Sequence, residues 1–315
     1  MLLLFGIACA PTDPASTTGS AGATLSVVTT IFPIYDWVRH ILGEEASHVE
    51  LTMLLDAGVD LHSFQPSAAD IVRISTCDVF LYVGGESDEW VDDALKESQN
   101  PNQVVINLLD LLGDAVKEEE VIEGMQEEEH DHEEEKVAYD EHVWLSLKNA
   151  AYLCEAIAAR LGTADPDHTA LYRSNADAYI AKLNALDAAY AEAVNGATYR
   201  TVLFGDRFPF RYLVDDYDLS YYAAFAGCSA ETEASFKTIV FLAGKLDELG
   251  LPAILQIESA DGSIARTIRQ ATKTKDQAIL TLDSLQSVTA VEVQNGTSYL
   301  DRMAQNLEVW KQALH

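Results

Sequence analysis

The chain has 315 residues, enough for two domains of ordinary size, and its 48% of hydrophobic residues provide for a large core and exclude wholesale disorder. Its 51 acidic residues outnumber 20 basic ones, which gives a formal net charge of −31. Such a field attracts cations and repels nucleic acid, so we expect no nucleic-acid partner. Beyond the N-terminus no stretch approaches the roughly 18 apolar residues of a membrane-spanning helix.

The N-terminus begins with a short apolar run that ends at Cys9, followed by a stretch rich in Pro, Thr, Ser and Gly. This order is similar to a lipoprotein export signal in which Cys9 is lipidated, although the run is short and no Lys or Arg precedes it. We predict that residues 1–24 form this signal and a flexible tether. The protein would then lie outside the cytoplasm, anchored to the cell membrane or periplasmic. The alternative is a frayed hydrophobic tail.

Residues 25–164 are predicted to form an N-terminal α/β lobe, because β-branched runs alternate with helical patterns, which favours a parallel sheet with crossover helices. We expect strands at 25–30, 49–54, 79–83 and 104–108, and helices at 34–42 and 90–97. A further helix should begin at Ser67, which forms a capping-box pattern with Asp70.

An acidic segment at 118–135 interrupts this lobe with ten glutamates, one aspartate and two histidines, His130 and His132. So many carboxylates cannot be buried without partners, so we predict a solvated, mobile loop. Histidine among carboxylates is also a weak ligand set for divalent metals. The segment is therefore either an auxiliary metal-collecting loop or simply a solubilising one.

Residues 165–196 are predicted to form one long helix that starts at Asp165 and Pro166 and ends at Asn195 and Gly196. Apolar residues recur along it at spacings of three and four. They are Tyr172, Ala176, Tyr179, Leu183, Leu186, Tyr190 and Val194. A helix of this length suits a rigid connector between two lobes.

Residues 197–315 are predicted to form a C-terminal α/β lobe with strands at 201–204, 219–225, 253–257 and 278–282. Helices are expected at 235–249, 263–272 and 298–314. Asp206, Glu258 and Asp283 follow the ends of three of these strands. Since ligands of open α/β sheets bind beyond the carboxyl ends of the strands, these carboxylates are candidate metal ligands, against the alternative of helix caps or loop charges.

Two histidines could complete such a site. His62 follows the second strand, and His142 follows the acidic segment. Neutral imidazole is the favoured nitrogen ligand for zinc and also suits manganese. Two imidazoles and one or two carboxylates from both lobes would form a closed cage without an open catalytic position. Four other histidines are interpreted as ordinary surface or core residues: His40, His48, His168 and His315.

Five motifs carry a family resemblance: VTTIFP at 28–33, GVDLHSFQPS at 58–67, HVWL at 142–145 with Asn149, FGD at 204–206 and LDS at 282–284. With these motifs the chain resembles the zinc/manganese solute-binding proteins of bacterial ABC importers, from about residue 25 to the C-terminus. The resemblance implies two lobes joined by a rigid helix, one Zn²⁺ or Mn²⁺ between the lobes, and an ABC permease as partner. It matches His62, His142 and Asp283 to metal-binding positions.

One departure concerns the family's third metal-binding residue, usually His, whose position corresponds to Gly205. Glycine offers no ligand, so Asp206 or Glu258 is the candidate replacement, with Asp206 preferred because it is adjacent. Arg207 offers either carboxylate an ion-pair partner, which would withdraw it from the metal. An oxygen ligand favours manganese somewhat, whereas a Glu/His loop in this family goes with zinc.

The sequence therefore predicts a monomeric binding protein that captures zinc, or else manganese, and is not an enzyme. Two alternatives remain open. A metal-dependent hydrolase would use His62, His142 and a carboxylate with metal-bound water, and Glu258 as base, but no helical His-Glu-x-x-His motif is present. A surface adhesin would hold the metal for structural reasons alone.

Overall fold

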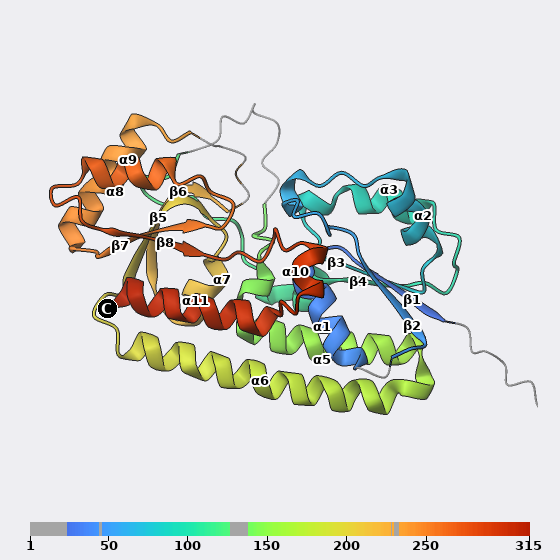
Figure 1. Cartoon of the computed structure of the whole chain (residues 1–315). Helices are drawn as coiled ribbons and strands as arrows, with labels where there is room; N and C mark the ends of the chain where they lie inside the picture. Colours follow the sequence, from blue (N-terminus) through green and yellow to red (C-terminus); the bar gives the residue numbers. More distant parts are fainter. Residues whose placement is uncertain (1–23, 44–45, 127–137, 228, 230–232) are drawn as a thin grey trace, which may run out of the picture.

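The computed structural model describes residues 24–43, 46–126, 138–227, 229 and 233–315. Two parallel four-stranded sheets lie side by side, with long helices running beneath them (Figure 1). The predicted architecture of two α/β lobes joined by a long helix is therefore confirmed.

The first sheet has the strand order β2-β1-β3-β4 and is parallel throughout. Its strands are β1 Leu25–Thr29, β2 Val49–Met53, β3 Val79–Tyr82 and β4 Val104–Asn107. The helices of this lobe are α1 Phe32–Leu42, α2 Ala68–Thr76, α3 Trp90–Lys96, α4 Leu108–Leu112 and α5 Leu147–Ala164. Four short 3-10 turns connect them: η1 Leu61–Ser63, η2 Glu86–Asp88, η3 Gly113–Ala115 and η4 Val143–Leu145. The capping box of Ser67 and Asp70 starts α2 as predicted.

The second sheet has the order β6-β5-β7-β8 and is also parallel. Its strands are β5 Thr201–Phe208, β6 Ser220–Ala226, β7 Ala253–Ile257 and β8 Ala278–Leu282. The helices are α7 Arg211–Asp216, α8 Phe236–Leu249, α9 Ser263–Ala271, α10 Ala290–Gln294 and α11 Tyr299–Leu314. Strand β5 is longer than predicted, and its register with β6 shifts between Phe204 and Arg207.

The connecting helix α6, Thr169–Asn195, has 27 residues and a length of roughly 40 Å. All but one of the residues predicted for its apolar face are buried, and Leu186 is half-buried. The helix does not begin at Asp165 as predicted. A 3-10 turn, η5 Pro166–His168, comes first, and the Asp165 side chain caps no backbone N–H because it bonds to the side chains of His48, His168 and Tyr172.

The two lobes share a helical base in which α1 and α11 both pack on α6. The shorter helix α5 also packs against α6 (Figure 1). The buried carboxylate of Asp36 in α1 accepts a hydrogen bond from the backbone N of Tyr299, the first residue of α11, at 2.9 Å. The Tyr299 hydroxyl in turn donates to the carbonyl of Trp144 at 2.6 Å. One cluster of buried side chains therefore continues from one lobe into the other.

Candidate metal centre

His62 lies in η1, on the loop between β2 and α2. The carboxylate of Asp60 accepts a hydrogen bond from the backbone N of His62 at 3.0 Å and so caps the turn. The ring nitrogen Nδ1 is 2.6 Å from Ser87 Oγ and 3.7 Å from Glu141 Oε2. When Nδ1 carries the proton, which these oxygens favour, the lone pair of the ring is on Nε2.

His142 directly precedes η4 and is fully buried. One carboxylate oxygen of Asp140 accepts a hydrogen bond from the backbone N of His142 at 2.9 Å and lies 3.0 Å from the ring Nδ1 of His142. At the end of β6 the chain approaches closely: a Cβ on Gly227 would come within 3.1 Å of the His142 ring. This packing and the Asp140 carboxylate fix the ring orientation and leave Nε2 directed at His62.

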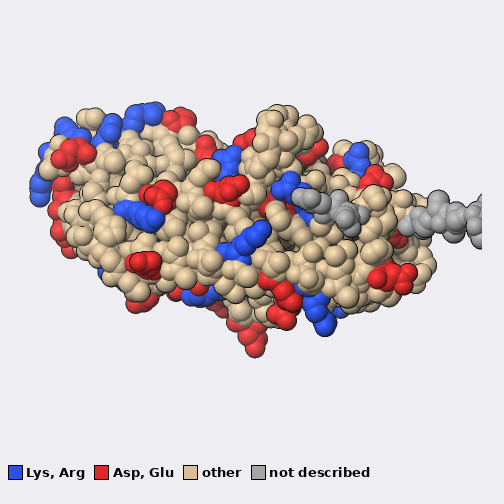
Figure 2. All heavy atoms as spheres, turned by 60° about the horizontal axis from the view of Figure 1, so that its bottom comes forward, with Lys and Arg blue, Asp and Glu red and all other residues tan. Residues whose placement is uncertain are grey.

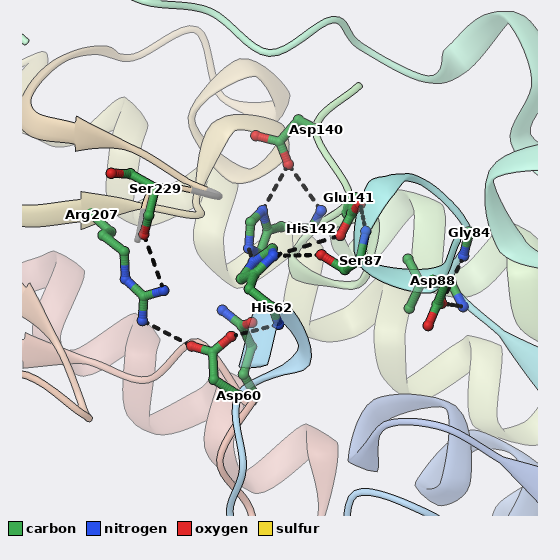
Figure 3. Close-up of polar contacts among 12 residues, drawn as sticks. Asp60, His62, Gly84, Ser87, Asp88, Asp140, Glu141, His142, Arg207 and Ser229 are labelled. Atoms are coloured by element: carbon green, nitrogen blue, oxygen red, sulfur yellow. Dashed lines mark hydrogen bonds and ion pairs between the residues drawn. The ribbon is translucent and has the colours of Figure 1, made fainter. Parts of the chain in front are cut away.

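The two Nε2 atoms meet at 3.2 Å, although the histidines are 80 residues apart in sequence (Figure 3). Zinc–nitrogen bonds of about 2.0–2.1 Å in a tetrahedral site place two ligand nitrogens roughly 3.3 Å apart. Metal-binding histidines also typically anchor their other nitrogen on an oxygen, as both rings do here. The predicted meeting of His62 and His142 therefore has the spacing of two ligands of one ion.

The charge state of the pair follows from burial and from the neighbouring groups. Burial, together with the adjacent His142, lowers the pKa of His62 to about 3. Burial also opposes protonation of His142, but the carboxylate of Asp140 outweighs it and raises the pKa of His142 above its usual value. Burial therefore keeps His62 neutral, whereas the carboxylate of Asp140 favours the protonated form of His142.

Arg207 of β5 reaches this pair from the second lobe. Its guanidinium donates to Asp60 at 2.8 Å and to the carbonyl of Ser229 at 3.5 Å (Figure 3). Burial opposes the charge of Asp60, but Arg207 and His62 hold the pKa of Asp60 below its usual value. Arg207 therefore pairs with Asp60 across the lobes, and not with Asp206 or Glu258 as the sequence suggested.

Gly205, the position that the resemblance assigned to the third ligand, is turned away from Arg207. A Cβ there would lie 2.8 Å from the Cα of Ala265, so a side chain at 205 would collide with α9. The register shift in β5 breaks the regular alternation between Gly205 and Arg207. The residue of this strand that reaches the two histidines is therefore Arg207.

Asp206 lies inside β5 and not beyond its end. One carboxylate oxygen accepts from the backbone N of Arg207 at 2.8 Å, and the other accepts from the backbone N of Ile257 at 3.1 Å. Asp206 thus holds the end of β7 where the sheet bonding with β5 is interrupted. Burial raises its pKa, with a smaller contribution from Glu258.

Glu258 and Asp283 follow β7 and β8 as predicted, and both are occupied within their own lobe. Glu258 accepts from the backbone N of Ser284 at 2.7 Å and from two serine hydroxyls. Asp283 accepts from the backbone N of Leu285 and from Arg302 at 3.0 Å. Burial, with the nearby Glu258, raises the pKa of Asp283 to about 6.

Glu258 contributes to the raised pKa of both Asp206 and Asp283, but the hydrogen bonds and ion pairs of these three carboxylates in the described part of the chain do not include His62 or His142. The groups that do surround the histidines are Asp60, Ser87, Asp140, Glu141 and Arg207. A repeated Asp-x-His spacing, at 60–62 and 140–142, was the sequence signal for two of them. Cys9, His130 and His132 lie outside the described residues.

Comparisons with known proteins identify relatives of this chain. Residues 27–313 match the family described as "Zinc-uptake complex component A periplasmic". The chain is 32% identical over 313 residues to the zinc-binding lipoprotein AdcA of Streptococcus pneumoniae, covering 98% of this chain but 58% of that protein. It is 30% identical to the high-affinity zinc uptake system protein ZnuA of Bacillus subtilis, covering 98% of this chain and 93% of that protein.

Among solved structures, the Zn(II)-bound ZnuA-like domain of Streptococcus pneumoniae AdcA is similar, with a TM-score of 0.71 and 27% identity over 92% of this chain and 99% of that one. In the described part of this chain, no helix is both long enough and apolar enough to cross a bilayer.

Proposed function

Because the chain belongs to the family described as zinc-uptake complex component A periplasmic, we propose that it captures a divalent transition metal, zinc before manganese, and delivers it to an ABC permease. The observation that carries this proposal is the 3.2 Å approach of His62 Nε2 and His142 Nε2, each in a ring whose other nitrogen is anchored on an oxygen. The chain spans about 58% of the length of the AdcA relative, so the activity of that whole protein is itself part of the proposal.

His62 and His142 supply two ligands, and we propose that the others come from the carboxylates named from the sequence, Asp206, Glu258 and Asp283. No oxygen of these carboxylates lies within 4.8 Å of both histidine Nε2 atoms in the described chain, so each would have to move towards the histidines and exchange a present hydrogen bond for the ion. Asp283, whose raised pKa marks a costly buried charge, would gain most from a cation. The ion is bound as cargo, so a closed ligand set serves better than one with an open catalytic position. The family name likewise describes a component of an uptake complex.

The protein would work outside the cytoplasm as a monomer, held to the membrane through lipid on Cys9. The acidic segment, with His130 and His132, would raise the local concentration of cations near His62 and His142 through its charge. The described beginning of this segment is tied to the second lobe. Glu120 pairs with Arg211, and Gln126 accepts from the backbone N of Ser235 at 2.7 Å. We propose residues 25–164, 165–196 and 197–315 as the first lobe, connecting helix and second lobe.

The test is a zinc titration of the metal-free full chain against a competing chelator. His62→Gln and His142→Gln should each weaken the tight site by at least about 100-fold, as expected for loss of a zinc ligand. Asp206→Asn, Glu258→Gln and Asp283→Asn identify the oxygen ligand by the variant that loses affinity. His315→Gln, at the exposed C-terminus, is the matched control. Wild-type affinity in both variants of His62 and His142 would refute the proposal.

The stability of the metal-free chain distinguishes metal transport from the alternative of an adhesin with a structural ion. The core continues between the lobes without any metal ligand, so the metal-free chain should stay folded and rebind zinc reversibly. Cooperative melting upon chelation would favour the structural role. Hydrolysis of ester or phosphate model substrates by the zinc-loaded chain would favour the hydrolase.

A further inference from the structure

A second group of metal-ligating side chains lies at the turn between α5 and α6, at the far end of α6 from the second lobe (Figure 1). His48 precedes β2, Asp165 ends α5, and His168 closes η5. One ligand atom from each residue lies within 4.8 Å of the other two, and among the described residues this is the one such trio of His, Cys, Asp or Glu.

The ligand atoms of this trio lie close enough together for one ion to contact all three after small side-chain movements. His48 Nε2 lies 3.2 Å from Asp165 Oδ2, and His168 Nδ1 lies 2.7 Å from the same oxygen. Bonds of about 2.0–2.2 Å from zinc to nitrogen and oxygen set ligand atoms of a tetrahedral site roughly 3.3 Å apart. The two imidazole rings stack with centroids 3.9 Å apart and an interplanar angle of 18°, and each directs one nitrogen at Asp165 Oδ2.

Three polar groups of this cluster share one carboxylate oxygen. A single oxygen of Asp165 faces His48, His168 and the hydroxyl of Tyr172, which donates to it at 2.6 Å. A single divalent cation would bind through one nitrogen of each histidine and through the carboxylate, and would neutralise the carboxylate charge.

Partial exposure suits an exchangeable ion. The side chains of His48, Asp165 and His168 are 28%, 15% and 39% exposed, so a metal held by all three keeps a coordination position open to water. Imidazole and carboxylate ligands with one open position favour zinc and its transition-metal neighbours over calcium or magnesium.

We propose that His48, Asp165 and His168 form a second binding site for a divalent transition metal, weaker than the site of His62 and His142 and separate from it. The ion would tie the segment before β2 to the turn between the two long helices, and would raise the zinc capacity of the described chain to two.

The test uses the full chain with His62, His142, His130 and His132 all replaced by Gln, which leaves the trio as the remaining histidine cluster. Zinc should bind to this background with a Kd below about 0.1 mM. His48→Gln and His168→Gln should each weaken that binding at least tenfold, while His315→Gln should not. Tyr172→Phe keeps all three ligands, so it should retain the binding.

A spectroscopic measurement keeps the proposal falsifiable if a variant folds poorly. In the same background, with ¹⁵N-labelled histidine, zinc should shift Nε2 of His48 and Nδ1 of His168, the nitrogens that face Asp165. Unshifted nitrogens at a tenfold excess of zinc, or equal zinc binding before and after His48→Gln, would overturn the proposal.

Discussion

Arg207 and Asp60 form an ion pair of 2.8 Å that crosses between the lobes beside the two histidines. The pair brings one fixed positive charge and one negative charge to the place where a cation would bind. Arg207 opposes the ion, Asp60 attracts it, and each at present compensates the other.

Breaking this pair should shift metal affinity in opposite directions. Arg207→Gln removes the repelling charge and frees Asp60, so we expect zinc affinity to rise about tenfold, or roughly 1.4 kcal/mol. Asp60→Asn should lower it by a similar factor, and the double variant should return close to wild type. Chelator competition measures all three, and Arg73→Gln, which breaks an exposed pair with Asp70, is the control. Unchanged affinity in both single variants would contradict this account.

Zinc affinity should decrease as the pH falls, with a slope that corresponds to the displacement of one proton. His62, with a pKa of about 3, is already neutral at pH 5, whereas the raised pKa of His142 means that zinc must displace a proton from it. Below the pKa of His142 we therefore expect affinity to drop about tenfold per pH unit, against about 100-fold if both rings were protonated. Titrations between pH 5 and 8 measure the slope, and a flat profile would show that zinc displaces no proton from His142, which would exclude His142 as a ligand.

We expect the acidic segment to concentrate cations near the tight zinc site without supplying a ligand to it. Replacing residues 127–136 by a Gly-Ser linker of equal length keeps the contacts of Glu120 and Gln126 with the second lobe. Affinity at the tight site should stay within about twofold, because screened loop charges act mainly on local ion concentration. Weaker additional zinc binding should be lost in the same titration. Loss of the tight site instead would mean that the segment supplies a ligand.

Asp88 should make the fold less stable as pH rises. Burial raises its pKa to about 7, and although Val83 N and Gly84 N donate to one oxygen at 3.0 Å, the other has no hydrogen-bond partner. The folded state binds this proton more tightly than the unfolded one, so its stabilisation is present below pH 3.8 and is lost as pH rises through 7. The loss amounts to roughly 4 kcal/mol.

Denaturant unfolding at several pH values checks this prediction. Asp88→Asn removes the titration, so the difference in unfolding free energy between wild type and variant should shrink or reverse between pH 4 and 8. Asp93→Asn, in an exposed pair with Lys96, is the control. A constant difference across this range would show that Asp88 is not protonated in the folded chain.

The strands and the two histidines could be predicted because their signals are local. Strands β7 and β8 lie where the pattern put them, and His62 and His142 stand in recognisable motifs. What the sequence could not show depends on side-chain direction. The register shift in β5 turns Gly205 towards α9 and Arg207 towards Asp60, and no spacing rule reveals it.

Helix starts illustrate the same limit. Asp165 before Pro166 has the composition of a helix cap, yet its carboxylate is taken by His48, which is 117 residues away. Likewise the carboxylates of Asp206 and Glu258 were predicted as candidate metal ligands, but they accept hydrogen bonds from backbone N–H groups of β7 and of the turn after β8. Such competition between partners distant in sequence is decided only by the folded chain.

The hydrogen bond between Asp36 and Tyr299, the first residue of α11, restricts how the two lobes can move relative to each other. Because the two lobes share a helical base and one buried core, a hinge opening between them would have to break these contacts. The residues of η4 are fully buried and its Trp144 carbonyl accepts from Tyr299, so η4 belongs to the same fixed base. Exchange of a bound ion would then depend on movement of η1, the short turn that carries His62.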